Sequence, residues 1–454
     1  MSIRRVKILF FTFCFLLCGL VGCADGSEEP SQPMSSEDSS ETTSAIPTET
    51  QTTVPDSSDP SDPSVTTTKP YTTTEGTTVP TTPSPKPAAP KTLANTYYKL
   101  THDKNLKIVY CGGSITGGHG SSGPNAHYSA LTTNWLKSKF PTASIEYRES
   151  TRGGHGSTWG IFYLDVSLSD LISGPSFGEK ADLYFLEYAI NDNYDGLTGT
   201  QSSRNIESMI KKIYTQNPYA DIVLLFTTDT SKNGGDFEQL TAIRRLAEYY
   251  GLPCINLGAQ LAAEGNLSAY LIDTVHPNDA GYQKYASYIT GFLEDNLVNG
   301  GLSASDLNQQ EQPAAMLNSG CFGAKMVLAD ALYAGNEAES TYSPWDIKTG
   351  VGNIEKMKIY SHVTLTEGHV LTYTFSGTKV WILGDMSSAA TSITAELDGK
   401  TSKKLDFGAF HSGKDGQYAV LFDGLSSGTH TLKITVSGKK GYIGALMIAD
   451  ENAY

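Results

Sequence analysis

The chain has 454 residues, of which 39% are hydrophobic and 18% charged, and its formal net charge at pH 7 is −15. An excess of acidic groups repels phosphates and therefore argues against a nucleic-acid partner. Beyond the first 23 residues no segment is long and apolar enough to span a bilayer. The composition thus excludes a nucleic-acid-binding protein and a polytopic membrane protein.

The first residues have the features of an export signal. A basic stretch at 4–7 precedes an apolar run at 8–20, which is too short to cross a bilayer and typical of a signal peptide. The run ends in Leu-Val-Gly-Cys, which resembles a bacterial lipobox. We therefore expect residues 1–23 to be a lipoprotein signal peptide. Cys23 would then carry the lipid that anchors the protein outside the cell, on the bacterial surface, as its only contact with the membrane. The alternative is an ordinary cleaved signal peptide with an accidental cysteine.

Residues 24–92 have the composition of a flexible tether. They contain 12 of the 20 prolines, many Ser and Thr residues, and 3 Lys against 11 acidic side chains. Such a segment cannot bury enough apolar surface to offset the entropy lost on ordering. We predict a disordered linker at 24–92.

Residues 93–298 alternate short apolar runs with amphipathic segments, which predicts an α/β domain. The predicted strands are 108–111, 144–149, 183–190, 222–226 and 254–257, and the predicted helices are 127–140, 161–172, 204–215, 237–250 and 279–297. This alternation indicates a parallel sheet covered by helices on both faces, a three-layer, flavodoxin-like arrangement. Ligands of such folds bind at the carboxyl ends of the strands.

After a polar connector at 299–318, the hydrophobic period changes to two. Leu371, Tyr373 and Phe375 alternate with polar residues, and Asp-Gly and Ser-Gly pairs separate similar runs. We predict an all-β sandwich or jelly-roll domain at 319–454. Four aromatic residues of this domain either fill its core or bind glycan: Trp345, Tyr373, Trp381 and Tyr442. Trp381 alternates with the residues of the apolar face, which favours its burial.

Three cysteines remain after the signal peptide and Cys23. Cys111, Cys254 and Cys321 have the spacing of neither a disulfide framework nor a zinc site. Because Cys111 and Cys254 lie in apolar runs, we expect buried, unreactive thiols.

Reactive side chains follow two of the predicted strands and precede the last predicted helix. Ser114 comes directly after a strand and two glycines, which allow a sharp turn and expose its hydroxyl. Asn191 lies at the end of another predicted strand, and Asp273 precedes His276 by three residues. A serine nucleophile needs a base, and a neutral base needs an orienting carboxylate. These residues therefore predict nucleophilic catalysis.

Four segments resemble the sequence blocks of the SGNH (GDSL-like) hydrolases. They are Gly112–Thr116, Arg152–Ser157, Ala189–Asp192 and Asp273–Pro277, and they occur in the family's order within residues 105–282. The first block departs from the family where Gly113 replaces an Asp and Ile115 a Leu. The second has Glu149 where an Asn is usual.

The resemblance implies a role for each matching residue. Ser114 would be the nucleophile, His276 its base, and Asp273 the residue that orients His276. The backbone N–H groups of Ser114 and Gly154, with the side-chain amide of Asn191, would form the oxyanion hole. Gly153 is an alternative to Gly154. The resemblance implies no metal and no cofactor.

Simpler interpretations exist for several of these residues. Ser114 or His276 can cap a helix, and Asn191 can belong to an ordinary turn. The string 118–123 matches a dinucleotide-binding fingerprint, but it begins several residues after the strand. His119 and His155 fall in loops beside the predicted site, where they contact substrate or serve only the structure.

The architecture resembles that of bacterial carbohydrate esterases. We therefore expect a serine esterase that removes acyl groups, and acetyl groups in particular, from an acetylated poly- or oligosaccharide such as xylan. The alternatives are a lipase, lysophospholipase or thioesterase, an esterase acting on O-acetylated cell-wall glycan, and a non-catalytic glycan-binding surface protein.

Overall fold

The computed structural model describes residues 87–169, 177, 178, 180–303, 305–317, 320–334, 346–349, 358, 359, 361–406 and 418–452. All of them belong to one unit of the chain, Pro80–Tyr454. The predicted signal peptide with Cys23, most of the predicted linker, and Trp345 lie outside the described residues. No helix within the described ranges is long and apolar enough to cross a membrane.

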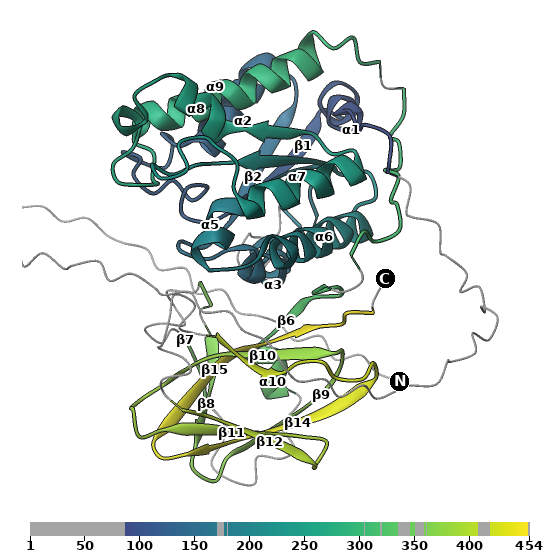
Figure 1. Cartoon of the computed structure of the whole chain (residues 1–454). Coiled ribbons are helices and arrows are strands. Elements are labelled where there is room, and N and C mark those ends of the chain that lie inside the picture. The colour runs from purple at the N-terminus through teal and green to yellow at the C-terminus, as the bar shows by residue number, and fades with distance from the viewer. Residues whose placement is uncertain are drawn as a thin grey trace, which may run out of the picture. The chain divides into compact units, whose positions relative to one another are not determined.

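The first domain is built on a parallel sheet of five strands in the order β2-β1-β3-β4-β5 (Figure 1). The strands are β1 (Asn105–Gly112), β2 (Ser144–Thr151), β3 (Leu183–Glu187), β4 (Asp221–Phe226) and β5 (Cys254–Asn256). Every residue of β3 and β4 is buried, as expected for a parallel sheet that is covered on both faces. The predicted α/β class is confirmed.

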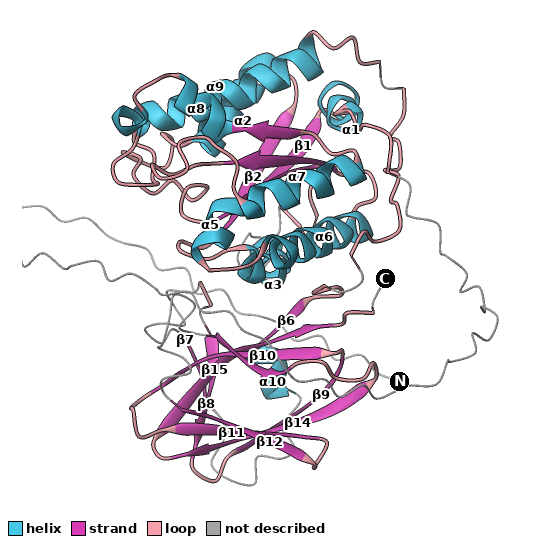
Figure 2. Ribbon diagram, in the orientation of Figure 1, coloured by secondary structure: helices cyan, strands magenta, loops and turns pink. Residues whose placement is uncertain are grey.

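Helices cover both faces of this sheet (Figure 2). They are α1 (Ala94–Tyr98), α2 (Tyr128–Lys139), α3 (Ser157–Leu168), α5 (Ala189–Tyr194), α6 (Gly199–Gln216), α7 (Glu238–Tyr250), α8 (Leu257–Ala263) and α9 (Asp279–Leu293), with single turns at Lys99–Asp103, Leu267–Tyr270 and Glu294–Val298. Residues of α3, α6 and α7 form one core with Tyr184 and Leu224, whereas α2, α8 and α9 pack with Phe185 and Val223. Alternate residues of the same strands therefore belong to different cores.

Three sequence predictions need correction. The predicted strand 183–190 ends at Glu187, and Ala189–Tyr194 forms helix α5 instead, because an apolar run does not by itself distinguish a strand from a buried helix. The predicted helix 161–172 begins earlier, at Ser157, and ends at Leu168. Cys254 is exposed rather than buried, since it lies on β5, the edge strand of the sheet. Cys111 and Cys321 are buried as expected.

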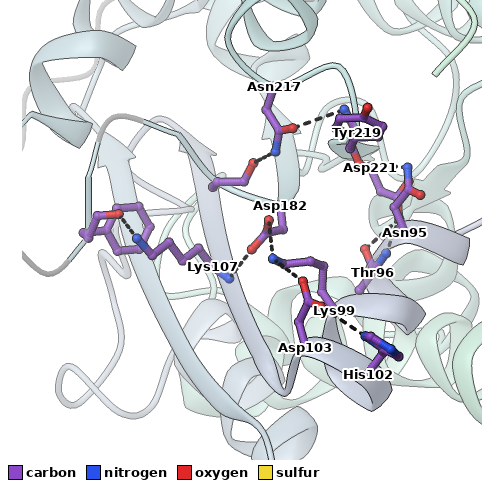
Figure 3. Close-up of polar contacts among 12 residues, drawn as sticks. Asn95, Thr96, Lys99, His102, Asp103, Lys107, Asp182, Asn217, Tyr219 and Asp221 are labelled. Carbon is purple, nitrogen blue, oxygen red and sulfur yellow. Dashed lines mark hydrogen bonds and ion pairs between the residues drawn. The ribbon is translucent and has the colours of Figure 1, made fainter. Parts of the chain in front are cut away.

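Two carboxylates tie the amino ends of the strands to flanking segments (Figure 3). Asp221, the first residue of β4, accepts hydrogen bonds from the backbone N–H and hydroxyl of Thr96 in α1, both at 2.7 Å. Its other oxygen accepts from Gln310 in the predicted connector at 2.7 Å. Asp182 likewise accepts from the N–H of Lys107 at 2.9 Å. These contacts close the end of the sheet where no catalytic residue was predicted.

The C-terminal domain consists of two antiparallel sheets. Their orders are β13-β10-β15-β8-β7, with β6 also paired to β15, and β12-β11-β14-β9. The elements are β6 (Lys325–Leu328), α10 (Ala329–Ala334), β7 (Asp346–Thr349), β8 (Ser361–Thr366), β9 (Val370–Ser376), β10 (Lys379–Met386), β11 (Ser392–Leu397), β12 (Thr401–Asp406), β13 (Tyr418–Phe422), β14 (Thr429–Ser437) and β15 (Lys440–Ala449). The predicted Asp398-Gly399 turn joins β11 to β12 with φ of 53° and 65°, and three residues separate the paired Leu397 and Thr401.

Apolar side chains of both sheets, such as Ile382 and Ile434, share one core. The opposite face of β10 packs on α3 of the first domain, where the rings of Phe162 and Trp381 lie 5.2 Å apart. Trp381 is 7% exposed, in agreement with the burial that its alternation predicted. Tyr373 and Tyr442 are partly buried and pack against the hydrophobic cores.

Candidate active site

The turn that carries Ser114 depends on close packing of glycine. Gly112 ends β1, and a Cβ atom there would overlap the hydroxyl of Thr116. A Cβ on Gly113 would overlap the side-chain amide of Asn191. Gly113 therefore cannot be the Asp of the usual first block without moving Asn191. Because Gly113 has no side chain, Asn191 can lie directly against the nucleophile turn.

Ser114 and His276 lie within hydrogen-bonding distance although 162 residues separate them. The Ser114 Oγ is 2.7 Å from His276 Nε2, and His276 Nδ1 is 2.7 Å from Asp273 Oδ2. The other oxygen of Asp273 accepts from the backbone N–H groups of Val275 and His276, each at 2.8 Å. The Asp-x-x-His segment thus forms a turn in which the carboxylate fixes both the backbone and the imidazole.

The carboxyl of Asp273 remains ionised over a wide pH range. Partial burial raises its pKa, but the two backbone N–H groups and the imidazole of His276 outweigh that effect and bring the pKa to about 2. An anion beside Nδ1 favours the tautomer in which Nδ1 carries the proton. The unprotonated Nε2 would then face the hydroxyl of Ser114.

Gly154 lies in the loop between β2 and α3 with a φ of 74°, at which a residue with a side chain would be strained. Its neighbour Gly153 has no such φ, and the Gly153 carbonyl oxygen lies 2.9 Å from His155 Nδ1. Asn191 comes from α5 and is 8% exposed. Gly154 and Asn191 both line the pocket that holds Ser114.

Two further acids hold the start of α3: Asp192 of α5, and Asp195, which directly follows α5. Asp192 accepts from the N–H of Ser157 at 2.6 Å and from its hydroxyl at 2.8 Å, and Asp195 accepts from the N–H of Gly156 at 2.9 Å. These are the free N–H groups of a helix N-terminus, which favours negative charge. Burial raises the pKa of Asp192 to about 6, against hydrogen bonds from Ser202 and Ser157 that lower it. The two acids thereby fix the loop that contains Gly154.

One pocket of about 320 Å³ contains all five predicted side chains or backbone groups. Its lining comprises Ser114, Ile115, Gly154, Ile190, Asn191, Tyr194, Asp195, Asp273, Thr274, Val275 and His276. The pocket opens where β1 and β3 end, as expected for a parallel sheet. Glu149 is not part of it, because Glu149 accepts hydrogen bonds from His127 and Ser129 of the α2 region, both at 2.5 Å.

Glu187, the last residue of β3, is a buried acid that sequence reasoning missed. It is 0% exposed and accepts from the hydroxyls of Thr116 at 2.9 Å and Thr227 at 2.7 Å. Burial raises its pKa to about 7 despite these hydrogen bonds. The available signal was one acid inside the apolar run Leu183–Ile190. Glu187 links the ends of three neighbouring strands beneath the nucleophile turn.

His119 lies beside the predicted base. Its ring meets that of His276 edge-on at 4.3 Å between centroids, and the backbone N–H of His119 donates to the backbone carbonyl of Ser114 at 2.9 Å. Within the described residues, His119, Asp273 and His276 could together hold a metal ion, since one ligand atom from each lies within 4.8 Å of the others. However, Asp273 and His276 already bond to each other and to Ser114, an arrangement suited to proton transfer.

The other sequence alternatives fit the structure less well. The glycine-rich string 118–123 forms turns, and α2 begins only at Tyr128, so the string does not open a helix as a dinucleotide-binding motif would. His155, next to Gly154 in the chain, is 3% exposed and packs near Trp159 and Tyr418.

Residues 110–284 match the GDSL-like Lipase/Acylhydrolase family. The chain thus contains a GDSL-like acylhydrolase domain, and it is a hydrolase that acts on esters. No curated protein matches the chain.

Solved structures extend the likeness to both domains. A two-domain esterase (CEX) active on acetylated mannans has a TM-score of 0.61 at 18% identity, covering 81% of this chain and 98% of that chain. The same type of esterase co-crystallised with mannopentaose has a TM-score of 0.60 at 19% identity, with the same coverage. An acetyl xylan esterase, AlAXEase, has a TM-score of 0.33 at 20% identity and covers 41% of this chain and 100% of that chain. The first two matches establish the two-domain fold.

The raised pKa of Glu187 predicts a pH-dependent cost of folding. A carboxyl whose pKa rises from 4.5 to about 7 on folding favours the folded state at low pH, and this contribution is lost as the pH rises through 7. Glu187→Gln removes the titration. The free energy of unfolding of Glu187→Gln should therefore increase relative to that of the wild type between pH 4.5 and 7.5, as measured by urea titrations. The exposed Glu367→Gln is the control for loss of one charge, and a Glu187→Gln difference that falls with pH would contradict the assignment.

Proposed function

We propose that the chain is a serine esterase that removes acetyl groups from a carbohydrate. The observation that carries this proposal is the continuous hydrogen-bonded series Asp273–His276–Ser114 at a pocket that Gly154 and Asn191 also line. A hydroxyl, an imidazole and a carboxylate in this order support nucleophilic catalysis.

In the first half-reaction, Ser114 Oγ attacks the ester carbonyl while its proton passes to His276 Nε2. The carbonyl oxygen becomes an anion, which the N–H groups of Ser114 and Gly154 and the amide of Asn191 stabilise. His276 then gives the proton to the departing sugar oxygen, and the acyl group remains on Ser114. In the second half-reaction, water attacks this acyl-enzyme with His276 again as base, which releases acetate and restores Ser114. Asp273 keeps the imidazole in the required orientation throughout.

The pocket and the structural neighbours support a small acyl group on a glycan. A volume of about 320 Å³ is at the lower end for ligand pockets, and the lining mixes polar groups with short apolar ones. The two structures that share this two-domain fold are esterases described as active on acetylated mannans. We propose an acetylated polysaccharide of the mannan or xylan type as the substrate class.

Loss of the nucleophile should abolish turnover. We expect wild type to release acetate from acetylated mannan or xylan, and Ser114→Ala to lower kcat on the order of 10⁶-fold, since the attacking oxygen is gone. Acetate release from a panel of acetylated mannan, xylan and peptidoglycan measures the activity of the wild type and of Ser114→Ala. Faster hydrolysis of octanoyl than of acetyl esters would instead favour a lipase, and equal activity of Ser114→Ala would exclude this serine mechanism.

Asn191→Ala should reduce kcat about 10²–10³-fold with a small change in KM, because the amide acts on the charge that develops in the transition state. Steady-state kinetics on an acetyl ester measure the two parameters separately. The matched control is Asn193→Ala on the same helix, whose amide donates to Gln239 and does not line the pocket. A rise in KM alone would assign Asn191 to substrate binding rather than to the oxyanion hole.

We also propose that the mature chain begins at a lipidated Cys23, on the strength of the lipobox resemblance. Cys23→Ser should move the protein from the detergent phase to the aqueous phase in Triton X-114 partitioning of cells that express the full chain. Cys254→Ser, which changes an exposed cysteine of the folded domain, is the control and should stay in the detergent phase. Retention of Cys23→Ser in the detergent phase would exclude this lipid anchor.

A further inference from the structure

Tyr194 is an exposed aromatic side chain on the wall of the pocket. It ends helix α5, three residues after Asn191, and it lines the same cavity as Ser114 and His276. Its side chain is 41% exposed. Among the Phe, Tyr and Trp residues in the described ranges, only Tyr219 is exposed to a similar extent, and Tyr219 does not line this pocket. The aromatic surface of Tyr194 is therefore available to a ligand that reaches Ser114 through this pocket.

The polar end of the ring is firmly held. The hydroxyl of Tyr194 donates to Asp229 Oδ2 at 2.9 Å. Asp229 is 2% exposed, and its other oxygen accepts from the Ser231 hydroxyl at 2.6 Å and from the Lys232 N–H at 2.7 Å. Burial raises the pKa of Asp229, but these hydrogen bonds prevail and the pKa is lowered. Asp229 is therefore a stable anionic acceptor that orients Tyr194.

The loop that supplies this acceptor is joined to the loop of the predicted base. The N–H of Thr230 donates to the carbonyl of Thr274 at 2.8 Å, and Thr274 lies between Asp273 and His276. The position of the Tyr194 ring is thus fixed relative to the imidazole. A ring that is already immobilised loses little rotamer entropy when a ligand packs on it, which favours binding.

We propose that Tyr194 is the platform on which the sugar ring bearing the scissile acetyl group packs, an inference that rests on the proposed function. A pyranose presents a face of C–H groups whose partial positive charge suits the negative face of an aromatic ring. The sugar hydroxyls at its edge remain free for water or for polar groups of the pocket. Packing on this ring would orient the sugar so that the acetyl carbonyl faces Ser114.

Such a platform acts on glycan esters and not on small esters without a ring. We compare kcat/KM for acetylated mannooligosaccharides with kcat/KM for ethyl acetate, in wild type, Tyr194→Ala, Tyr194→Phe and Tyr219→Ala. Ethyl acetate is preferable to 4-nitrophenyl acetate, because an aromatic leaving group would itself stack on Tyr194. The Phe variant keeps the ring and loses only the hydrogen bond to Asp229.

We expect Tyr194→Ala to lower kcat/KM for the oligosaccharide about tenfold, with ethyl acetate changed less than about twofold. Tyr194→Phe should retain at least about one third of the oligosaccharide activity, and Tyr219→Ala should match wild type on both substrates. Oligosaccharide activity of Tyr194→Ala equal to wild type would overturn the platform and leave the proposed function intact. An equal loss on both substrates would also overturn it, since the tether to Asp229 would then serve the catalytic loops. If wild type hydrolysed ethyl acetate but no acetylated glycan, the proposed function and this inference would both be wrong.

Discussion

The site depends on the hydrogen bonds that the carboxylate of Glu187 accepts. Glu187 ends the central strand β3, and its two oxygens accept from Thr116, which follows β1, and from Thr227, which follows β4. A buried charge is tolerated only where hydrogen bonds replace its hydration, so these neighbours must keep their positions. The nucleophile turn is therefore held by the strand ends independently of its contact with His276.

Helix α5 supplies the second support from only six residues. Asn191 contacts the nucleophile turn, Asp192 fixes the N-terminus of α3, and Tyr194 reaches toward the loop after β4. Successive residues of a helix point about 100° apart, so the side chains of one short helix can contact three different loops. A strand in the same place would alternate between only two directions. The early end of β3 thus has a direct consequence for the site.

The sequence allowed prediction of the parts of the site that depend on local geometry. Gly-Gly-Ser after a strand and Asp-x-x-His before a helix each form their turns from neighbouring residues, and the hydrophobic pattern gave the sheet that brings them together. The pairing of Glu187 with Thr116 and Thr227, and of Tyr194 with Asp229, joins residues distant in sequence, for which no periodicity exists. The exposure of Cys254 likewise follows from strand order, because an apolar run at an edge looks like one in the centre.

The carboxyl groups of the site take up protons in different pH ranges. Asp273, which receives two backbone N–H groups near solvent, has a pKa of about 2, whereas burial raises the pKa of Asp192 to about 6 and of Glu187 to about 7. As the pH falls through 7 and then through 6, first Glu187 and then Asp192 takes up a proton, while Asp273 stays ionised and still orients His276. This protonation favours the folded state, since the raised pKa values mean that the fold binds these protons more tightly than the unfolded chain. It also removes the negative charge that attracts the N–H of Ser157 and the hydroxyl of Thr116. The protons taken up on acidification therefore fall on the acids that support the loop at Gly154 and the nucleophile turn, whereas Asp273 keeps its charge.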